Sequence, residues 1–377
     1  MSGPSEQQLA FLQQFGFDQE LQQRCQDDVA AGRLSVETNA VTGDLLAPPP
    51  GTIQKLPGTG TKGLRDLERL GREAIARGEL GVVVLNGGMA TRFGGVVKGV
   101  VPVLGETRSF LGLVVEDIQA AERVGGRVPL FLMNSFATHV ATQQHFALHE
   151  HFGLDPAQTE HFTQFIALRM DKKGALFQLE NGELSPYGPG HGDFPSAFRK
   201  CGALQRFVDG GGRYLLVRNV DNLGARLDPA ILGHHIAAGV DATVEVAPKW
   251  PEDQGGSPYL FEGRVQLVEQ VRYPEGFDPN IVDVFNCNTF TFSAAALDRD
   301  FDLGWYYVEK NVDGRKAVQV EHLIGELTRF LKSSYLQVKR QGRTSRFLPI
   351  KAPEDLEAAR DEIREMYDVD TTDDRDA

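Results

Sequence analysis

The hydrophobic residues of the chain form short apolar runs that alternate with segments of helical periodicity. The run at residues 82–85, VVVL, has no polar alternation, which is typical of a strand buried on both faces of a parallel sheet. Similar runs follow at residues 128–133, 214–220 and 242–247. Because helical patterns separate these runs, the sequence predicts an α/β fold with crossover units on a mixed, mainly parallel sheet.

The remaining pattern completes the predicted order of elements. Two short helices begin the chain; Gly16 ends the first and Asp18 caps the second. Residues 45–62 are too rich in Pro and Gly for regular structure, and residues 259–271 read as a β-hairpin that adds antiparallel strands to the sheet. Further helices are predicted at residues 64–78, 109–125, 138–153, 229–238, 319–331 and 353–367, and further strands at residues 282–292 and 336–340.

A glycine-rich segment, LNGGMATRFGGVVK, follows the first apolar run. Its glycines let the backbone turn sharply and approach a ligand, and its N–H groups can hold phosphate oxygens beside a cation. The segment matches neither G-x-x-x-x-G-K-[ST] nor G-x-G-x-x-G, so a tight turn without a ligand is the alternative. Its candidate binding residues are Asn86, Gly87, Gly88, Thr91, Arg92 and Lys98.

Composition and charge narrow the possible partners. A net charge of −13 over 377 residues argues against nucleic acid or an anionic membrane, because both require a basic surface. Small phosphorylated ligands need only a local basic pocket. The N-terminus has no basic start or apolar signal core, and the three cysteines suit reduced thiols, so a cytoplasmic protein is expected.

Three polar residues could carry chemistry, each with a plainer alternative. Asp221 ends an apolar run and could bind Mg²⁺, or could cap the following turn. His191 lies among glycines in GPGHGD and could face a ligand, or could be incidental to a flexible loop. Lys351 ends the run RFLPIK and could contact a phosphate, or could be a surface lysine. Together, Lys98, Lys351 and Asp221 provide the groups that phosphoryl or nucleotidyl transfer requires.

The motifs resemble a known family when they are taken in order. LNGGMATRFGGVVK, LMNSF, GPGHGD, NVDNLGA, VAPKW, LVEQV, FNCN and RFLPIK occur in the order found in the UDP-glucose pyrophosphorylase family (UTP:glucose-1-phosphate uridylyltransferases). The resemblance covers roughly residues 81–356 and implies a Rossmann-like nucleotidyltransferase core of the GT-A type. With the periodicity and composition of the flanking segments, this gives a helical extension and linker at residues 1–62, a catalytic domain at residues 63–367, and an acidic tail at residues 368–377.

The resemblance also implies a role for each motif residue. Lys98, Lys351 and Asp221 would be catalytic, with Asp221 binding Mg²⁺. The nucleotide would be bound by Leu85, Asn86, Gly87, Gly88, Thr91, Arg92, Met133, Asn134 and Gln164. The sugar phosphate would be bound by His191, Gly192, Asn219, Lys249, Glu269, Asn286 and Asn288.

The implied reaction is an in-line attack of a sugar 1-phosphate oxygen on the α-phosphorus of UTP, which releases pyrophosphate without a covalent enzyme intermediate. Glucose 1-phosphate ranks first as substrate; an N-acetylhexosamine or galactose 1-phosphate, or a catalytically silent nucleotide-sugar binding protein, is the alternative. Ala90 and Val97 replace the family's usual Gly and Pro in the loop. Eukaryotic members of the family continue into a C-terminal β-helix, so an oligomer built through that domain is not implied and the oligomeric state stays open.

Overall fold

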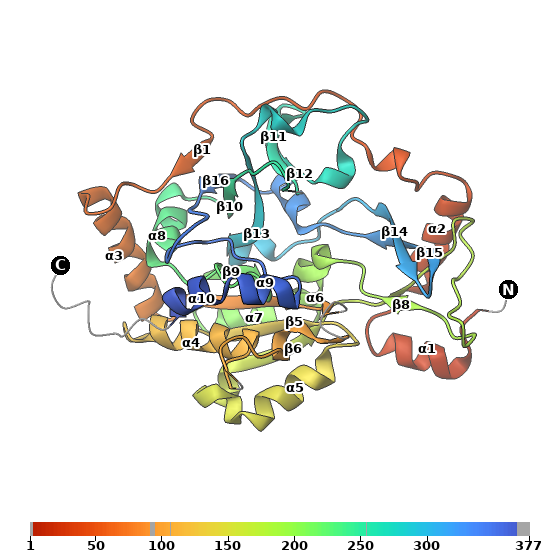
Figure 1. Ribbon diagram of the computed structural model, residues 1–377, viewed down its shortest axis with the longest axis horizontal. Helices are drawn as coiled ribbons and strands as arrows, with labels where there is room; N and C mark the ends of the chain where they lie inside the picture. Colours follow the sequence, from red (N-terminus) through yellow and green to blue (C-terminus); the bar gives the residue numbers. More distant parts are fainter. Residues whose placement is uncertain (1–2, 91–94, 106, 254, 368–377) are drawn as a thin grey trace.

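An eight-stranded sheet forms the centre of the computed structural model, which describes residues 3–90, 95–105, 107–253 and 255–367 (Figure 1). The strand order is β1, β16, β10, β13, β9, β2, β5, β6. Only β13 runs antiparallel to its neighbours, so the predicted mixed, mainly parallel sheet is confirmed. The strands are β1 Ile53–Lys55, β16 Ser333–Gln337, β10 Ala242–Pro248, β13 Val284–Ser293, β9 Tyr214–Asn219, β2 Leu80–Asn86, β5 Leu130–Asn134 and β6 Thr159–Thr163.

Helices cover both faces of this sheet, which explains the unbroken apolar run in β2. Val83 and Leu85 belong to the core cluster that includes α6 and α7, whereas Val82 and Val84 belong to the cluster on the other face. Successive residues of a strand point to opposite faces, so both sets must be apolar. The helices are α3 Lys62–Ala76, α4 Phe110–Glu122, α5 His139–Leu148, α6 Phe194–Lys200, α7 Ala203–Asp209, α8 Pro229–Ala238, α9 Pro353–Ala358 and α10 Arg360–Tyr367.

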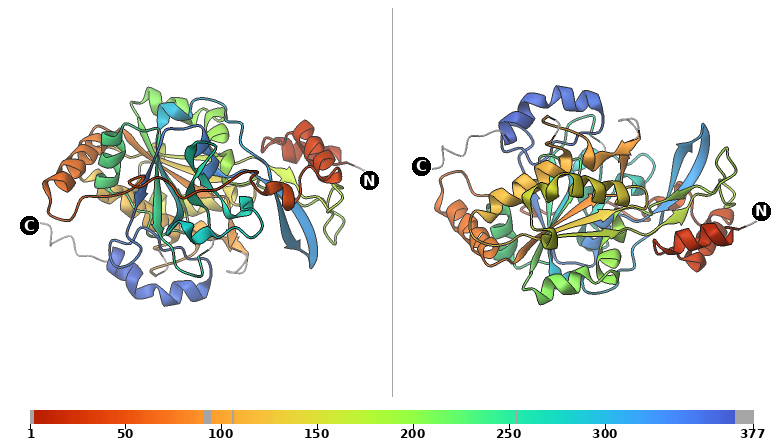
Figure 2. Two further views of the ribbon diagram at one scale, coloured as in Figure 1. Left: turned by 90° about the horizontal axis from the view of Figure 1, so that it is seen from above. Right: turned by 90° about the horizontal axis from the view of Figure 1, so that it is seen from below.

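The N-terminal helices pack at one end of the molecule, beside the hairpin of β14 and β15 (Figure 2). Both helices were predicted, and the Asp18 side chain accepts the Leu21 N–H at 2.9 Å as the expected cap. Cys25 of the second helix packs in one cluster with Val320 of β15. These elements are α1 Glu6–Gln13, α2 Gln19–Ala30, β14 Tyr306–Val312 and β15 Arg315–Glu321.

The predicted hairpin near residue 262 is present, but it does not join the main sheet. Its strands, β11 Ser257–Phe261 and β12 Arg264–Val268, form a separate two-stranded sheet. Glu262 and Gly263 both have positive φ, 52° and 74°, as a two-residue hairpin turn requires. The other short pairs are β3 Met89–Ala90 with β4 Val96–Val97, and β7 Ala167–Leu168 with β8 Pro186–Tyr187.

The helix predicted at residues 319–331 is wrong. The structure has strand β15 there, followed by a 3₁₀ helix at Ile324–Arg329. Val318 and Val320 alternate with polar residues and are buried, which is a strand pattern that the helical interpretation overlooked.

Three further differences concern segments with weak sequence signals. Residues 45–62 were expected to be irregular, yet β1 within them adds to the sheet edge beside β16. The C-terminal helix is divided at Ala359 into α9 and α10. Strands β6 and β14 and helices α6 and α7 had not been predicted. Across the described ranges, no helix has the length and apolar character needed to cross a bilayer.

Candidate active site

A cleft of about 520 Å³ opens where β2, β5 and β9 end. In parallel sheets, ligands bind at the carboxyl ends of the strands, so this is the expected place for a site. Its lining includes the predicted residues Leu85, Gly87, Gly88, Lys98, Met133, Gln164, His191, Asn219 and Asp221.

Lys98 and Asp221 meet at this cleft from opposite parts of the chain. Lys98 begins a short 3₁₀ helix at Lys98–Val100, and its Nζ lies 3.2 Å from the Asp221 Oδ2. The same ammonium donates to the Ile350 carbonyl at 2.9 Å, which fixes its position. Val97, directly before the lysine, has φ −69°, the angle that a proline would impose, so the departure from the family pattern preserves the backbone path.

Two glycines from separate loops make room for the amide of Gln164. A Cβ on Gly87 would lie 3.0 Å from the Gln164 Nε2, and a Cβ on Gly188 would lie only 1.6 Å from the same atom. The Gln164 side chain is buried beside the cleft, and its backbone N–H donates to the Asn134 carbonyl at 2.8 Å. An amide held in this way offers one donor and one acceptor edge, which suits the edge of a pyrimidine base.

His191 presents a neutral ring to the cleft. Its Nδ1 accepts the Ile324 N–H at 3.0 Å, so the hydrogen of the neutral ring is on Nε2. Burial lowers the pKa of His191 to about 4, which keeps the ring uncharged near neutral pH. The next residue, Gly192, donates its N–H to the His322 carbonyl at 3.2 Å. His191 is therefore an oriented hydrogen-bond donor rather than a cation or a base.

Asn286 and Asn288 lie inside strand β13 rather than at its carboxyl end, where ligands usually bind in parallel sheets. The antiparallel direction of β13 explains their position. The first half of β13 lies at the carboxyl edge of β9 and β10, because it runs opposite to both. A bulge in this half gives Asn288 a φ of +53°, and its Nδ2 donates to the Asn219 Oδ1 at 2.8 Å.

Asn286 continues this network toward the hairpin. Its Nδ2 donates to the Glu269 Oε1 at 3.1 Å, and the other carboxylate oxygen accepts the Gly256 N–H at 3.1 Å. Burial raises the pKa of Glu269. The structure thus connects Glu269, Asn286, Asn288 and Asn219 in a row of polar groups beside the cleft.

Four predicted residues direct their side chains elsewhere. Asn86 and Asn134 are fully buried and hydrogen-bond to each other at 2.8 Å, so they join the ends of β2 and β5 rather than face the cleft. The Lys249 ammonium donates to the Pro279 and Val282 carbonyls at 2.8 and 3.1 Å. Lys351 lines a different hollow, although its neighbour Ile350 holds Lys98.

Arg169 and Gln319 also line the cleft, and neither had been predicted as a site residue. Arg169 donates hydrogen bonds to the Ser185 Oγ and the Pro186 carbonyl at 2.9 and 2.8 Å. When the amide of Gln319 is oriented with its oxygen toward Arg169, the guanidinium also donates to that oxygen. Arg169 precedes no glycine and ends no long apolar run, and Gln319 lies in the segment interpreted as a helix, so the sequence carried no usable signal. Thr91 and Arg92 lie outside the described residues.

These features define a nucleotidyltransferase with a Rossmann-like core. Glycines from two loops open a narrow slot beside a lysine–aspartate pair, and the whole site lies at the carboxyl edge of a mixed sheet. The sequence model of the UTP–glucose-1-phosphate uridylyltransferase family matches residues 51–372, and the chain belongs to this family. The predicted family, enzyme class and fold are confirmed.

Individual relatives agree with this assignment. The UTP–glucose-1-phosphate uridylyltransferase of Hordeum vulgare is 32% identical over 86% of this chain, and the chain spans 67% of that protein's length. The structure of the Trypanosoma brucei UDP-N-acetylglucosamine pyrophosphorylase is 21% identical, with a TM-score of 0.76 over 94% of this chain and 79% of that one. The UDP-glucose phosphorylase of the same organism is 23% identical, with a TM-score of 0.73 over 93% and 78%. The two solved structures establish the fold alone, and their names specify different sugars.

Proposed function

We propose that the chain transfers the uridylyl group of UTP to glucose 1-phosphate and releases pyrophosphate. The observation that carries the proposal is the Lys98–Asp221 pair, which lines the same cleft as the buried amide of Gln164 and the neutral ring of His191. Family membership supports the reaction class. The uracil would bind beside Gln164 and the sugar phosphate beside His191.

The reaction needs alignment more than acid–base catalysis. An oxygen of the sugar phosphate forms a bond to the α-phosphorus while the bond from that phosphorus to the β-phosphate oxygen breaks, and pyrophosphate leaves with the electron pair. The nucleophile is an anion near neutral pH, so it needs no base. The obstacle is repulsion between two anions, and the Lys98 ammonium, fixed by Ile350, lowers it.

Asp221 is the residue that would hold Mg²⁺. It is the only carboxylate among the described residues that line the cleft, and its side chain is 24% exposed. This donor set fits magnesium, which uses one or two carboxylates and completes its shell with phosphate oxygens and water. Bound there, the ion would neutralise charge on the phosphate oxygens of UTP.

The sugar end of the cleft suits a molecule with several hydroxyl groups. His191 offers a donor at Nε2, and the Asn219–Asn288 and Asn286–Glu269 pairs supply further donors and acceptors. Glucose 1-phosphate is the proposed substrate, and other hexose 1-phosphates are the alternative. The cysteines of the described residues are unpaired, which supports the proposed cytoplasmic location.

Pyrophosphate release tests the proposal directly. Purified protein would be given UTP, Mg²⁺ and a panel of sugar 1-phosphates, with ATP, CTP, GTP and dTTP as nucleotide controls. We expect release with UTP and glucose 1-phosphate. Silence across the panel in folded protein would instead favour a nucleotide-sugar binding protein.

The variant Asp221→Ala tests the metal assignment. We expect its turnover with Mg²⁺ to fall by at least ~100-fold, because the carboxylate that would hold the ion beside the transferred phosphate is lost. Asp302→Ala is the matched control, since Asp302 is exposed and is not among the residues that line the cleft. Near-normal turnover of Asp221→Ala would refute the assignment.

A further inference from the structure

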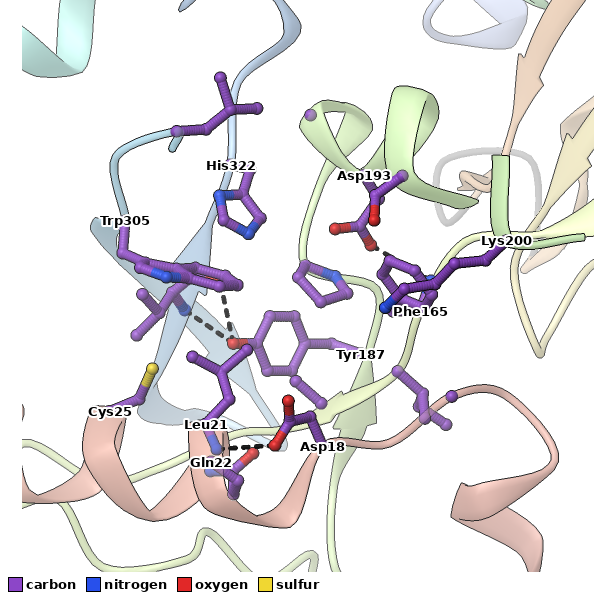
Figure 3. Close-up of a pocket in the computed structure, with 18 of the residues that line it drawn as sticks. Asp18, Leu21, Gln22, Cys25, Phe165, Tyr187, Asp193, Lys200, Trp305 and His322 are labelled. Atoms are coloured by element: carbon purple, nitrogen blue, oxygen red, sulfur yellow. Dashed lines mark hydrogen bonds between the residues drawn. The ribbon is translucent and has the colours of Figure 1, made fainter. Parts of the chain in front are cut away.

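A second pocket lies behind the sugar end of the cleft, between helix α2 and the catalytic domain (Figure 3). We call it the junction pocket. Its volume is about 220 Å³, and a single water needs only about 10–15 Å³ of such space, so a small organic molecule fits. Figure 3 shows Asp193 and Lys200 on one side of the pocket and Trp305 and His322 on the other.

The side chain of Asp193 is a buried carboxyl group with unused capacity. It is 4% exposed, and among the described residues its hydrogen-bond donor is the Phe165 N–H at 3.2 Å. A carboxylate can accept about four hydrogen bonds, so most of its capacity remains for a ligand in the pocket. Burial raises the pKa of Asp193 to about 7, which shows how little solvation the protein gives this group.

The other walls indicate what kind of ligand would bind. The Lys200 ammonium lies 4.6 Å from the centre of the Phe165 ring, and the aromatic side chain of Trp305 lies on the opposite side of the pocket. The Asp18 carboxylate alone balances the Lys200 ammonium, so the pocket has no excess positive charge with which to attract phosphates or nucleotides. A hydroxyl group both donates to a carboxylate and accepts from an ammonium, and the apolar face of a ring packs on aromatic side chains.

We propose that the junction pocket binds a small uncharged ring molecule with several hydroxyl groups, of the monosaccharide or cyclic-polyol class. The donors and acceptors of such a molecule match Asp193 and Lys200, and its ring faces match Trp305 and Phe165. No phosphate is required, which distinguishes this ligand from both substrates of the cleft.

The pocket is joined to His191 of the cleft by three consecutive residues, 322–324. His322 lines the pocket and accepts the Gly192 N–H at 3.2 Å, and Ile324 donates its N–H to His191 at 3.0 Å. A Cβ on Gly192 would lie 2.4 Å from the His322 Cβ, so the two segments have no space to move independently. A ligand against His322 therefore changes the position of His191, and the KM for sugar 1-phosphate should respond more than the KM for UTP. This kinetic expectation rests on the proposed function.

Direct binding tests the site without relying on turnover. Glucose, N-acetylglucosamine and myo-inositol would each be titrated into the full chain and followed by saturation-transfer NMR, with UDP-glucose present to occupy the cleft. We expect at least one probe to bind wild-type protein and to bind Lys200→Met at least ~10-fold more weakly, because a charged hydrogen bond is lost. Lys172→Met is the matched control, since Lys172 is an exposed lysine paired with Glu309 outside the pocket.

The variant Asp193→Asn provides a second measurement, because it keeps an acceptor for the Phe165 N–H and removes the charge. It should weaken the same probe while the thermal unfolding midpoint stays close to that of the wild type. Binding of no probe, equal binding to wild type and Lys200→Met, or displacement of the probe by UDP-glucose would each overturn the proposal. Binding of an amine or amino acid in place of these probes would overturn the assigned class. If pyrophosphate release fails while Lys200-dependent binding holds, the pocket stands and only the proposed reaction falls.

Discussion

Gly188→Ala is the substitution whose effect follows most directly from the geometry of the cleft. The new Cβ would lie 1.6 Å from the Gln164 Nε2 and 2.6 Å from its Cδ, so the amide must move by about 2 Å to restore ordinary contact. The backbone φ of Gly188 lies outside the left-handed region, so the backbone tolerates alanine at this position. The side chain of Gln164 is long enough to swing away, and the fold should survive.

The Gly188→Ala variant should lose the hydrogen bonds that the Gln164 amide is proposed to make to the uracil base. Leaving such groups unpaired costs roughly 1–3 kcal/mol, which lowers kcat/KM for UTP by roughly 5- to 150-fold. Pyrophosphate release at saturating glucose 1-phosphate measures it, and discrimination between UTP and CTP should fall in parallel. The matched control is Gly58→Ala, whose Cβ would make an ordinary contact of 3.7 Å with Thr61.

A double-mutant cycle decides whether Gly188 acts through Gln164. If it does, Gly188→Ala adds nothing once Gln164→Ala is present, because the amide is already gone. Additive losses of kcat/KM in the double variant, or wild-type kinetics of the Gly188→Ala variant alone, would refute this steric argument.

Three other predictions concern charge and stability. Arg169→Gln should lower kcat/KM by roughly 10-fold and flatten its dependence on salt, since the guanidinium lines a cleft for two anions; an unchanged salt slope would contradict this. Burial lowers the pKa of His235 to about 4, so below pH 6.5 the unfolded state binds a proton that the folded state does not. The free energy of unfolding of the wild type, relative to that of His235→Gln, should therefore be fully present above pH 6.5 and should fall by up to about 3 kcal/mol as the pH falls to 4. Urea titrations at each pH measure this difference. Glu245→Gln should cost about 3–5 kcal/mol in the same titrations, because it leaves the buried Arg346 guanidinium without its carboxylate; a loss below about 1 kcal/mol would show that the pair is dispensable.

The sequence predicted those parts of the site that depend on short segments. The apolar run of β2, its glycines, Lys98 and Asp221 can each be recognised locally, since a strand followed by a loop has a clear pattern. Distant pairings left weaker signals. The contact of Arg169 with Gln319 depends on β15, whose buried valines alternate over too few residues to exclude a helix.

The role of Asn288 could not be read from its own segment either. It reaches Asn219 of the cleft because β13 runs antiparallel to its neighbours and bulges there, and strand direction is a property of the whole sheet. A similar limit applies to the segment of Lys351, whose side chain lines a different hollow. The group that holds Lys98 is the backbone carbonyl of Ile350, and because every residue carries a backbone carbonyl, the sequence does not mark which one is used.

The two ends of the cleft are built by different physical means, and substitutions should therefore fail in different ways. At the nucleotide end, Gly87 and Gly188 act by leaving space, so any side chain displaces Gln164 whatever its chemistry. At the sugar end, Asn288 and Asn286 act through directed amide bonds to Asn219 and Glu269, so shape can be kept while function is lost. Asn288→Asp keeps the volume but places a carboxylate oxygen against the Asn219 Oδ1, where two acceptors repel each other. In the proposed reaction, nucleotide selection would therefore depend on steric fit and sugar selection on the order of donors and acceptors, so the sugar specificity could change without disturbing the proposed uridine site.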